Sequence, residues 1–416
     1  MELTMKRWIA LAALACCVGG CEWTDMRTGR REAYERWSRS RARMLCKLGN
    51  GKLQVGRLSE AGEKAREAVE TAPEFADARM LLGRIRIEQG DYEAAIGELK
   101  EAVKLEPKSP GAHYLLGVAM ERAGHVDLAI ESYRHSYELD ERNEAAAIAV
   151  GEVLAGAGRT KEAGRYVEER LSDGVRSATI LELAGRLAMM NEQYDLGVKH
   201  YTALVERERT NPHYQEALGR AHFVAGRFDL ARDALATRIA MPTGGKPEAL
   251  ASVWVHAMLG DCCAALGRPD AAARAYKTAV ELKPDSASLI VKLAQAHLDA
   301  GDIPEAVRAA RKALSVEPGH LDAALVLGCC LLRTGRAREA GEVLKTAAKT
   351  APDSPMLLCL LGRCHVAFGR DAEARACYQQ ALTIDPESRL ARELLSGMNG
   401  ADSLIDLESL IGGESG

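Results

Sequence analysis

Cysteine is the residue type that most suggests chemistry in this sequence, because eleven occur among its 416 residues. Three of them, Cys16, Cys17 and Cys21, lie close to the N-terminus. The other eight are Cys46, Cys262, Cys263, Cys329, Cys330, Cys359, Cys364 and Cys377. A thiolate metal site needs a spacing such as CxxC, which is absent, so we expect no metal centre. The simplest interpretation of these eight is that they are small apolar residues of a core.

Other catalytic signals are equally weak. The segment Gly244-Gly245-Lys246 invites comparison with a phosphate-binding loop, but Pro247 stands where a Ser or Thr would reach magnesium. The ten histidines are scattered and form no HExxH pair. No two carboxylates stand apart from the rest as an acid–base couple. The sequence therefore predicts no catalytic residue, no cofactor and no small-molecule substrate.

Composition describes a folded helical protein. Hydrophobic residues make up 47% and charged residues 27%, which excludes wholesale disorder. Aromatics reach only 5% beside 38 glycines, so a core must be built from Ala, Leu, Val and other small residues. That composition suits closely packed helices. The net charge of -4 argues against a general nucleic-acid-binding protein.

The N-terminus has the pattern of an export signal. A basic segment, Met5-Lys6-Arg7, precedes ten apolar residues from Trp8 to Cys17, too few to span a bilayer. The next residues, Val18-Gly19-Gly20-Cys21, resemble the lipobox of bacterial lipoproteins. The resemblance implies that residues 1–20 are removed and that Cys21 is lipidated. It implies a cell-envelope protein that faces the periplasm, and Glu22 favours the outer membrane. The alternatives are an ordinary cleaved signal and an uncleaved N-terminal anchor.

An arginine-rich segment follows the lipobox. Within residues 22–41 the arginines and large aromatics are Arg27, Arg30, Arg31, Arg36, Arg39, Arg41, Trp23, Tyr34 and Trp37. One interpretation is a juxtamembrane segment that meets anionic headgroups. The interpretation favoured by the sequence alone is a solvated tether that ends in a first capping helix.

Small residues recur through the chain with a period of 34 residues. The series is Gly49, Gly83, Gly117, Gly151, Gly185, Gly219 and, after a seven-residue insertion, Gly260, Ala294, Gly328 and Gly362. A second small residue stands twelve positions after each, and a glycine stands seven positions after each in nine of ten cases. Apolar residues at helical spacing predict two amphipathic helices in every unit. The glycine ends the first helix, and in six units a proline closes the second.

This pattern resembles the tetratricopeptide repeat (TPR). The resemblance covers residues 42–388 and implies an all-α fold, an α-solenoid of helix-turn-helix units in a right-handed superhelix with a concave groove. It predicts units one to six over 42–240, an insertion loop or hinge over 241–252, units seven to ten over 253–388 and a capping helix over 389–398. Arg170, Leu204 and Arg238 replace a small residue in units four to six. We expect looser or differently angled packing there.

In a helix pair whose small residues face each other, Cys359 lies roughly opposite Cys377. This pair is the best candidate for a disulfide, and the alternative is that both are buried thiols. The resemblance also carries groove positions onto this sequence. The exposed residues predicted to bind a partner there are Tyr114, Arg122, Arg186, Met189, Met190, Arg220, Phe223 and Trp254. The alternative is that these side chains pack between neighbouring first helices.

Residues 399–416 form an acidic and aliphatic tail. It is a linear motif for a partner, a segment that folds into the protein's own groove, or a disordered end. The favoured function is a membrane-anchored scaffold that binds a protein or peptide partner and assists assembly, secretion or export in the envelope. An enzyme would need a catalytic domain, for which the repeats leave no room.

Overall fold

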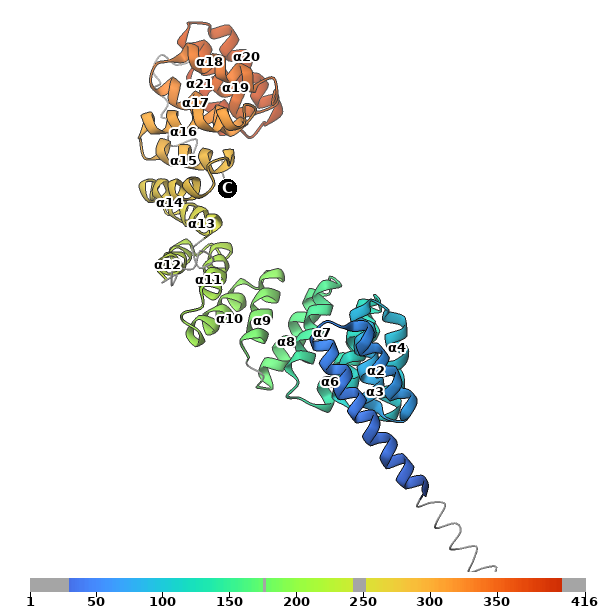
Figure 1. The fold of residues 1–416 in the computed structure, drawn as a ribbon. Coiled ribbons are helices and arrows are strands. Elements are labelled where there is room, and N and C mark those ends of the chain that lie inside the picture. The colour runs from blue at the N-terminus through green and yellow to red at the C-terminus, as the bar shows by residue number, and fades with distance from the viewer. Residues whose placement is uncertain (1–29, 175–176, 242–251, 399–416) are drawn as a thin grey trace, which may run out of the picture. The chain divides into compact units, whose positions relative to one another are not determined.

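The computed structural model describes residues 30–174, 177–241 and 252–398. Within these ranges the chain consists of helices joined by turns and contains no strand, which confirms the predicted all-α solenoid (Figure 1). The chain divides into two compact units, Met1–His200 and Tyr201–Gly416. The boundary between them falls inside α10 (Tyr194–Arg207).

The first unit begins, in its described part, with a helix over residues 30–54. The helices that follow it are α2 (Leu58–Thr71), α3 (Ala76–Gln89), α4 (Tyr92–Leu105), α5 (Pro110–Arg122), α6 (Val126–Leu139), α7 (Glu144–Gly156), α8 (Thr160–Ser172) and α9 (Ala178–Met190). Predicted units two to four each correspond to a pair of consecutive helices, whereas the first helix begins at residue 30, ahead of the predicted start of unit one at residue 42.

The second unit continues the same series after α10. Its helices are α11 (Pro212–Val224), α12 (Phe228–Ala240), α13 (Val253–Ala265), α14 (Pro269–Leu282), α15 (Ala287–Asp299), α16 (Ile303–Val316), α17 (Leu321–Arg333), α18 (Ala337–Ala347), α19 (Pro355–Ala367), α20 (Asp371–Ile384) and α21 (Arg389–Gly397). α21 occupies the segment predicted to cap the array. The predicted insertion loop lies outside the described residues, apart from Met241 and Ser252 at its two ends.

Left-handed glycines make the turn inside each helix pair. The nine glycines predicted to end first helices all have a positive φ, between +66° and +84°. They are Gly56, Gly90, Gly124, Gly158, Gly226, Gly267, Gly301, Gly335 and Gly369. A residue with a Cβ is strained in this conformation, so the sequence spacing predicted the turn correctly. Glu192 stands at the tenth position and keeps the geometry, with φ of +62°.

A second series of glycines lets the helices of a pair pack closely. A Cβ on Gly117 of α5 would lie 2.7 Å from the ring of Tyr133 in α6. A Cβ on Gly328 of α17 would lie 2.8 Å from Leu344 in α18. These distances leave no room for a side chain, because real Cβ contacts are longer. The predicted close approach is confirmed, and the structure shows that a large side chain of the second helix fills the space.

Short-range signals also set the helix ends. The Ser109 and Ser354 side chains accept hydrogen bonds from backbone N–H groups in the first turns of α5 and α19, and a proline follows each serine. α4 ends at Leu105 and α16 at Val316, each two residues before a proline. The backbone therefore begins and ends most helices where local chemistry predicts it.

Each unit has its own apolar interior. In the first unit, Leu99, Leu154 and Leu187 are fully buried within one continuous cluster. In the second, Ile290 and Leu344 are fully buried within another. Successive helix pairs share these clusters, so each repeat is stabilised mainly by its neighbours.

The three large residues that replace a small one are accommodated individually. Leu204 of α10 is fully buried and Arg238 of α12 is only 3% exposed, while Arg170 of α8 is stacked between tyrosines. Larger side chains therefore fill space at these positions. Looser or differently angled packing of these units stays a prediction.

Candidate protein-binding surface

The predicted groove residues of the first unit lie on α5 and α9. Tyr114 is half-buried, and its ring centroid lies 5.4 Å from that of Tyr133. The Tyr133 hydroxyl donates a 2.7 Å hydrogen bond to Glu121 Oε2, and burial raises the pKa of Tyr133. Arg122 is exposed. The structure thus places Tyr114 on a rigid, buried tyrosine and leaves Arg122 in solvent.

The α9 residues are divided between surface and interior. Arg186 is exposed and pairs with Glu152 of α7 at 3.2 Å, and Met190 is 54% exposed. Met189 instead packs inside its own helix pair, because a Cβ on Gly197 of α10 would lie 2.6 Å from its sulfur. Met189 lies one turn after the close-packed glycine of α9 and so shares its inward face. The sequence did not separate these two methionines.

The predicted groove residues of the second unit gather on α11 and α13. The Arg220 guanidinium carbon lies 5.8 Å from the centroid of the Trp254 ring. Trp254 is 37% exposed and Val224 is 48% exposed. Phe223 is half-buried and packs edge-to-face against Phe228, with ring centroids 5.4 Å apart. We name Arg220, Phe223, Val224 and Trp254 the α11–α13 patch.

The α11–α13 patch has the chemistry of a protein-binding surface. Trp and Arg carry a large share of the binding energy in protein interfaces, especially where they are held rigidly before binding. The Arg220 guanidinium lies over the indole ring of Trp254, as in a cation–π contact. The patch therefore offers an apolar surface and a fixed positive charge side by side.

An acidic residue continues this surface onto the next helices. Asp261 of α13 accepts hydrogen bonds of 2.6 Å from the Tyr276 hydroxyl and from Nζ of Lys292 in α15. Burial, followed by the bond to Asp261, raises the pKa of Tyr276. The carboxylate is thus held between two donors and links α13 to α14 and α15.

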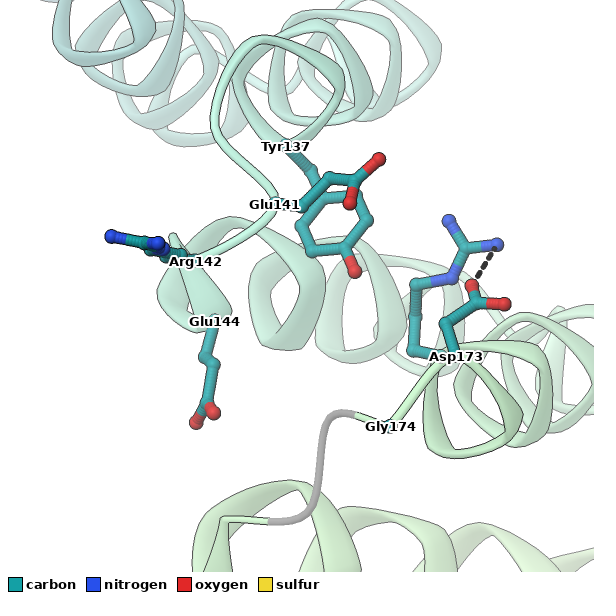
Figure 2. A pocket seen from close by; sticks show the side chains of 7 residues that line it. Tyr137, Glu141, Arg142, Glu144, Asp173 and Gly174 are labelled. Carbon is teal, nitrogen blue, oxygen red and sulfur yellow. Dashed lines mark ion pairs between the residues drawn. The ribbon is translucent and has the colours of Figure 1, made fainter.

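An open hollow lies at the ends of α6 and α8 in the first unit, and sequence reasoning missed it. It measures about 670 Å³ and is lined by Tyr137, Glu141, Arg142, Glu144, Arg170, Asp173 and Gly174. In Figure 2, the side chains of Arg142 and Glu144 are directed away from those of Tyr137 and Asp173.

Arg170 is the centre of this arrangement. Its guanidinium carbon lies 5.2 Å from the ring centroid of Tyr137 and 5.1 Å from that of Tyr166. It also pairs with Glu169 at 2.8 Å and with Asp173 at 3.2 Å. Burial raises the pKa of Tyr137, so its hydroxyl stays protonated at neutral pH. Arg170 is thus held between two aromatic rings and two carboxylates at the edge of the hollow.

Of the eight cysteines in the described residues, seven are buried and Cys377 is half-buried. The structure does not bond Cys359 to Cys377. Cys359 belongs to the cluster around α21, whereas Cys377 packs against the cluster that contains Cys364. Their position opposite each other and their pairing as a disulfide stay predictions. Burial raises the pKa of Cys364 to about 11, which disfavours the thiolate.

Two further features bear on the predicted site residues. Across the described residues, no cluster of three or more His, Cys, Asp or Glu side chains has the arrangement of a metal site. No helix in the described ranges is both long and apolar enough to cross a bilayer. Cys21 and the predicted signal lie outside the described residues.

Family comparisons agree with the repeat pattern. Residues 83–124 match the family described as TPR repeat. Residues 175–406, more than half of the chain, match the family described as the cilia and flagella-associated protein 70 C-terminal domain. No curated protein matches the chain.

Solved structures provide more distant likenesses. The Cut9-Hcn1 hetero-tetramer of APC/C is 12% identical, with a TM-score of 0.40, over 86% of this chain and 96% of that one. A tetratricopeptide repeat protein from Parabacteroides merdae is 15% identical, with a TM-score of 0.41, over 62% and 99%. Pseudomonas aeruginosa pilF is 20% identical, with a TM-score of 0.38, over 53% and 95%. These values support no statement about partners.

Proposed function

Because this chain belongs to the family described as the cilia and flagella-associated protein 70 C-terminal domain, and its fold is a TPR solenoid, we propose that it is a membrane-anchored scaffold for a protein partner. TPR proteins are in general non-catalytic scaffolds that bind other proteins. The partner binds along the first helices of the second unit, and the α11–α13 patch is its main contact.

The contact between Arg220 and Trp254 is the observation that carries this proposal. Both side chains belong to first helices and both are exposed, yet each holds the other in place. A prearranged pair loses little conformational entropy when a ligand binds. Val224 extends the patch as an exposed apolar residue beside them.

The patch indicates the chemistry of the partner. A segment with aliphatic side chains would cover Trp254 and Val224, and a carboxylate would meet Arg220. The chain's own tail has this composition, with Leu404, Asp406 and other acidic and aliphatic residues. Removal of residues 399–416 separates two roles, because a rise in partner affinity means autoinhibition and a loss means that the tail is itself a binding motif.

The test is to identify the partner by crosslinking in cells and then to measure its dissociation constant with purified chains. Trp254→Ala and Arg220→Ala should each weaken binding about tenfold or more. Leu230→Ala is the matched control, because Leu230 is 44% exposed on α12 and lies outside the patch. Unchanged affinity in both patch variants would reject this surface as the binding site.

The membrane anchor rests on the resemblance of Val18-Gly19-Gly20-Cys21 to a lipobox. We expect residues 1–20 to be removed, Cys21 to be acylated and the protein to face the periplasm, with the outer membrane favoured. Several acyl chains on one cysteine hold a protein stably at a bilayer. The envelope location suits a role in complex assembly, secretion or export.

Membrane fractionation of wild type and Cys21→Ser, together with the mass of the mature N-terminus, tests the anchor. Wild type should be cleaved, acylated and membrane-bound, whereas the variant should be none of these. If both proteins keep residues 1–20 and behave alike, the N-terminus is an uncleaved anchor or no anchor. The proposal that the repeats bind a protein partner would then remain, but the proposed location in the cell envelope would be wrong.

A further inference from the structure

The helix over residues 30–54 has two apolar faces, and only one of them is covered. Ala42, Leu45 and Cys46 are buried in the cluster that this helix shares with α2 and α3, and Ser38 and Gly49 continue the same buried face. This face explains why the helix docks on the first repeat. It does not explain the other apolar residues.

The second face is a stripe of large exposed side chains. Tyr34 is 65% exposed, Trp37 52%, Met44 65% and Leu48 52%. Their spacing of three, seven and four residues places all four on one side of a helix. Tyr34 and Trp37 touch each other, with ring centroids 5.8 Å apart. We name these four residues the N-terminal stripe.

Basic residues surround the N-terminal stripe. At 100° per residue, Arg30 and Arg41 lie within the stripe and Arg36 and Lys47 lie beyond one edge of it, whereas Arg43 lies on the far side, with its guanidinium carbon 5.9 Å from the centroid of the Phe75 ring. The Arg41 guanidinium carbon is 5.5 Å from the centroid of the Trp37 ring. The same geometry places the acidic residues Glu32 and Glu35 on the opposite side of the helix. Arg41 also pairs with Glu67 of α2 at 3.3 Å, so among the helix's own residues alone the charge within the stripe and along this edge is positive.

The start of the helix lacks any packing partner among the described residues. Residues 30–37 are exposed at every position. Figure 1 shows these first turns, in dark blue, extending beyond α2 and α3. Two isolated turns are not stable in water without a surface to pack against.

We propose that the N-terminal stripe binds the surface of an anionic lipid bilayer, with the helix lying along the headgroups. Trp and Tyr favour the interface between headgroups and acyl chains, and arginines are attracted to anionic lipid. Two copies of this face would repel each other, since both are basic. An acidic protein segment would match the charge but would not need the aromatic pair.

The proposal rests on the proposed anchor for its location. Acylated Cys21 precedes Arg30 by nine residues, which even fully extended reach only about 30 Å. The anchor would therefore hold the start of the helix close to the bilayer. The stripe would then fix the first repeat at the membrane surface and direct the rest of the scaffold to its partner.

The experiment uses the unacylated mature chain, residues 21–416 with Cys21→Ser, and vesicles of phosphatidylcholine alone or mixed with phosphatidylglycerol. Residues 1–20 lie outside the described residues, so this shortened chain keeps every described helix. Co-sedimentation should show about tenfold stronger binding to the anionic vesicles, and added salt should reduce it. The double variant Tyr34→Ala/Trp37→Ala should lose most of this binding.

The matched control is Leu128→Ala/Leu230→Ala, which removes two leucines of similar exposure from other helices, at 47% and 44%. It should bind vesicles as the parent does. Circular dichroism checks that all variants fold, which we expect because the replaced side chains are exposed.

Equal binding to both vesicle types, or unchanged binding in the stripe variant, overturns the proposal. The proposal is also overturned if the parent protein self-associates and the Tyr34→Ala/Trp37→Ala variant does not, because the stripe would then bind a second copy of the chain. Crosslinking of residues 399–416 to the stripe, with no vesicle binding, would assign it to the tail. None of these results depends on acylation, so a failed anchor and a failed stripe are distinguishable.

Discussion

At the scale of single residues, Glu192 stands where the other nine repeats have a glycine, yet its backbone keeps the left-handed conformation of those glycines. Among the described residues it alone has a positive φ without being a glycine, and its side chain is exposed. A left-handed residue with a Cβ costs roughly 1 kcal/mol or more. We therefore expect Glu192→Gly to raise the free energy of unfolding by about 1 kcal/mol, measured by urea denaturation.

The converse substitution is the control. Gly158→Ala places a Cβ in the same turn position of the preceding repeat, where φ is +76°, and should lower stability by a similar amount. A loss of stability in Glu192→Gly would contradict the strain argument.

The buried thiols predict how stability depends on alkaline pH. Burial raises the pKa of Cys329 to about 12, whereas an unfolded thiol titrates near about 8.5. Between these values the folded state holds more protons than the unfolded state. The free energy of unfolding should therefore fall as pH rises through this window, and the contribution should be complete below it.

Cys329→Ala tests this sign. Its denaturation midpoint should fall less steeply than that of wild type between about pH 8.5 and pH 11, even if the variant is less stable throughout. Parallel slopes for the two proteins would show that Cys329 does not contribute to this dependence.

The residue scale also shows what sequence can reveal about this molecule. The turn glycines were predictable because a left-handed backbone is a local requirement. The inward turn of Met189 and the stacking of Arg170 were not, because each depends on a partner in another helix. For Arg170 a signal existed, since it breaks the small-residue series while tyrosines stand at 137 and 166.

At the scale of elements, α11 and α12 are joined by a buried ion pair. Arg238 Nε lies 2.7 Å from Glu216 Oε1, and the two side chains are only 4% and 15% exposed. Removal of one partner leaves the other charge buried without compensation, which costs about 3–5 kcal/mol. Arg238→Ala should therefore destabilise the protein by that amount in thermal or urea denaturation.

The double variant Arg238→Leu/Glu216→Leu separates charge from packing. It should recover most of the lost stability, because a buried ion pair can be replaced by apolar groups of similar size. A double variant as unstable as Arg238→Ala would mean that the side-chain shape, rather than the uncompensated charge, is what the helix pair needs.

Helix boundaries were largely predictable, whereas the contacts between helices were only partly so. Glycine and proline act through their own backbone, so spacing alone located the turns inside the helix pairs and the ends of six second helices. The large residues at positions 204 and 238 predicted irregular packing. In the structure, the apolar side chain of Leu204 fills its space between the helices, whereas Arg238 forms a buried ion pair. Which solution occurs depends on residues opposite, and those are set by the tertiary fold.

At the scale of the whole molecule, a repeat array is stabilised by contacts between neighbours, and each of its two compact units contains a large buried cluster of its own. A local fault should therefore loosen its own unit first. Gly117 and Gly362 provide such faults, because a Cβ on either would clash with a buried tyrosine ring. Overpacking of this kind costs about 1–3 kcal/mol.

Hydrogen exchange followed by mass spectrometry tests this independence. Gly117→Ala should speed exchange in α5, α6 and their neighbours, and leave α19 and α20 unchanged, while Gly362→Ala should do the reverse. Gly341→Ala is the control, because its nearest contact would be an ordinary 3.9 Å and alanine favours the helix by about 0.5–1 kcal/mol. Faster exchange along the whole chain in either glycine variant would instead mean that the array opens as one cooperative structure. A partner bound at the α11–α13 patch would then stabilise every repeat, including those of the first unit.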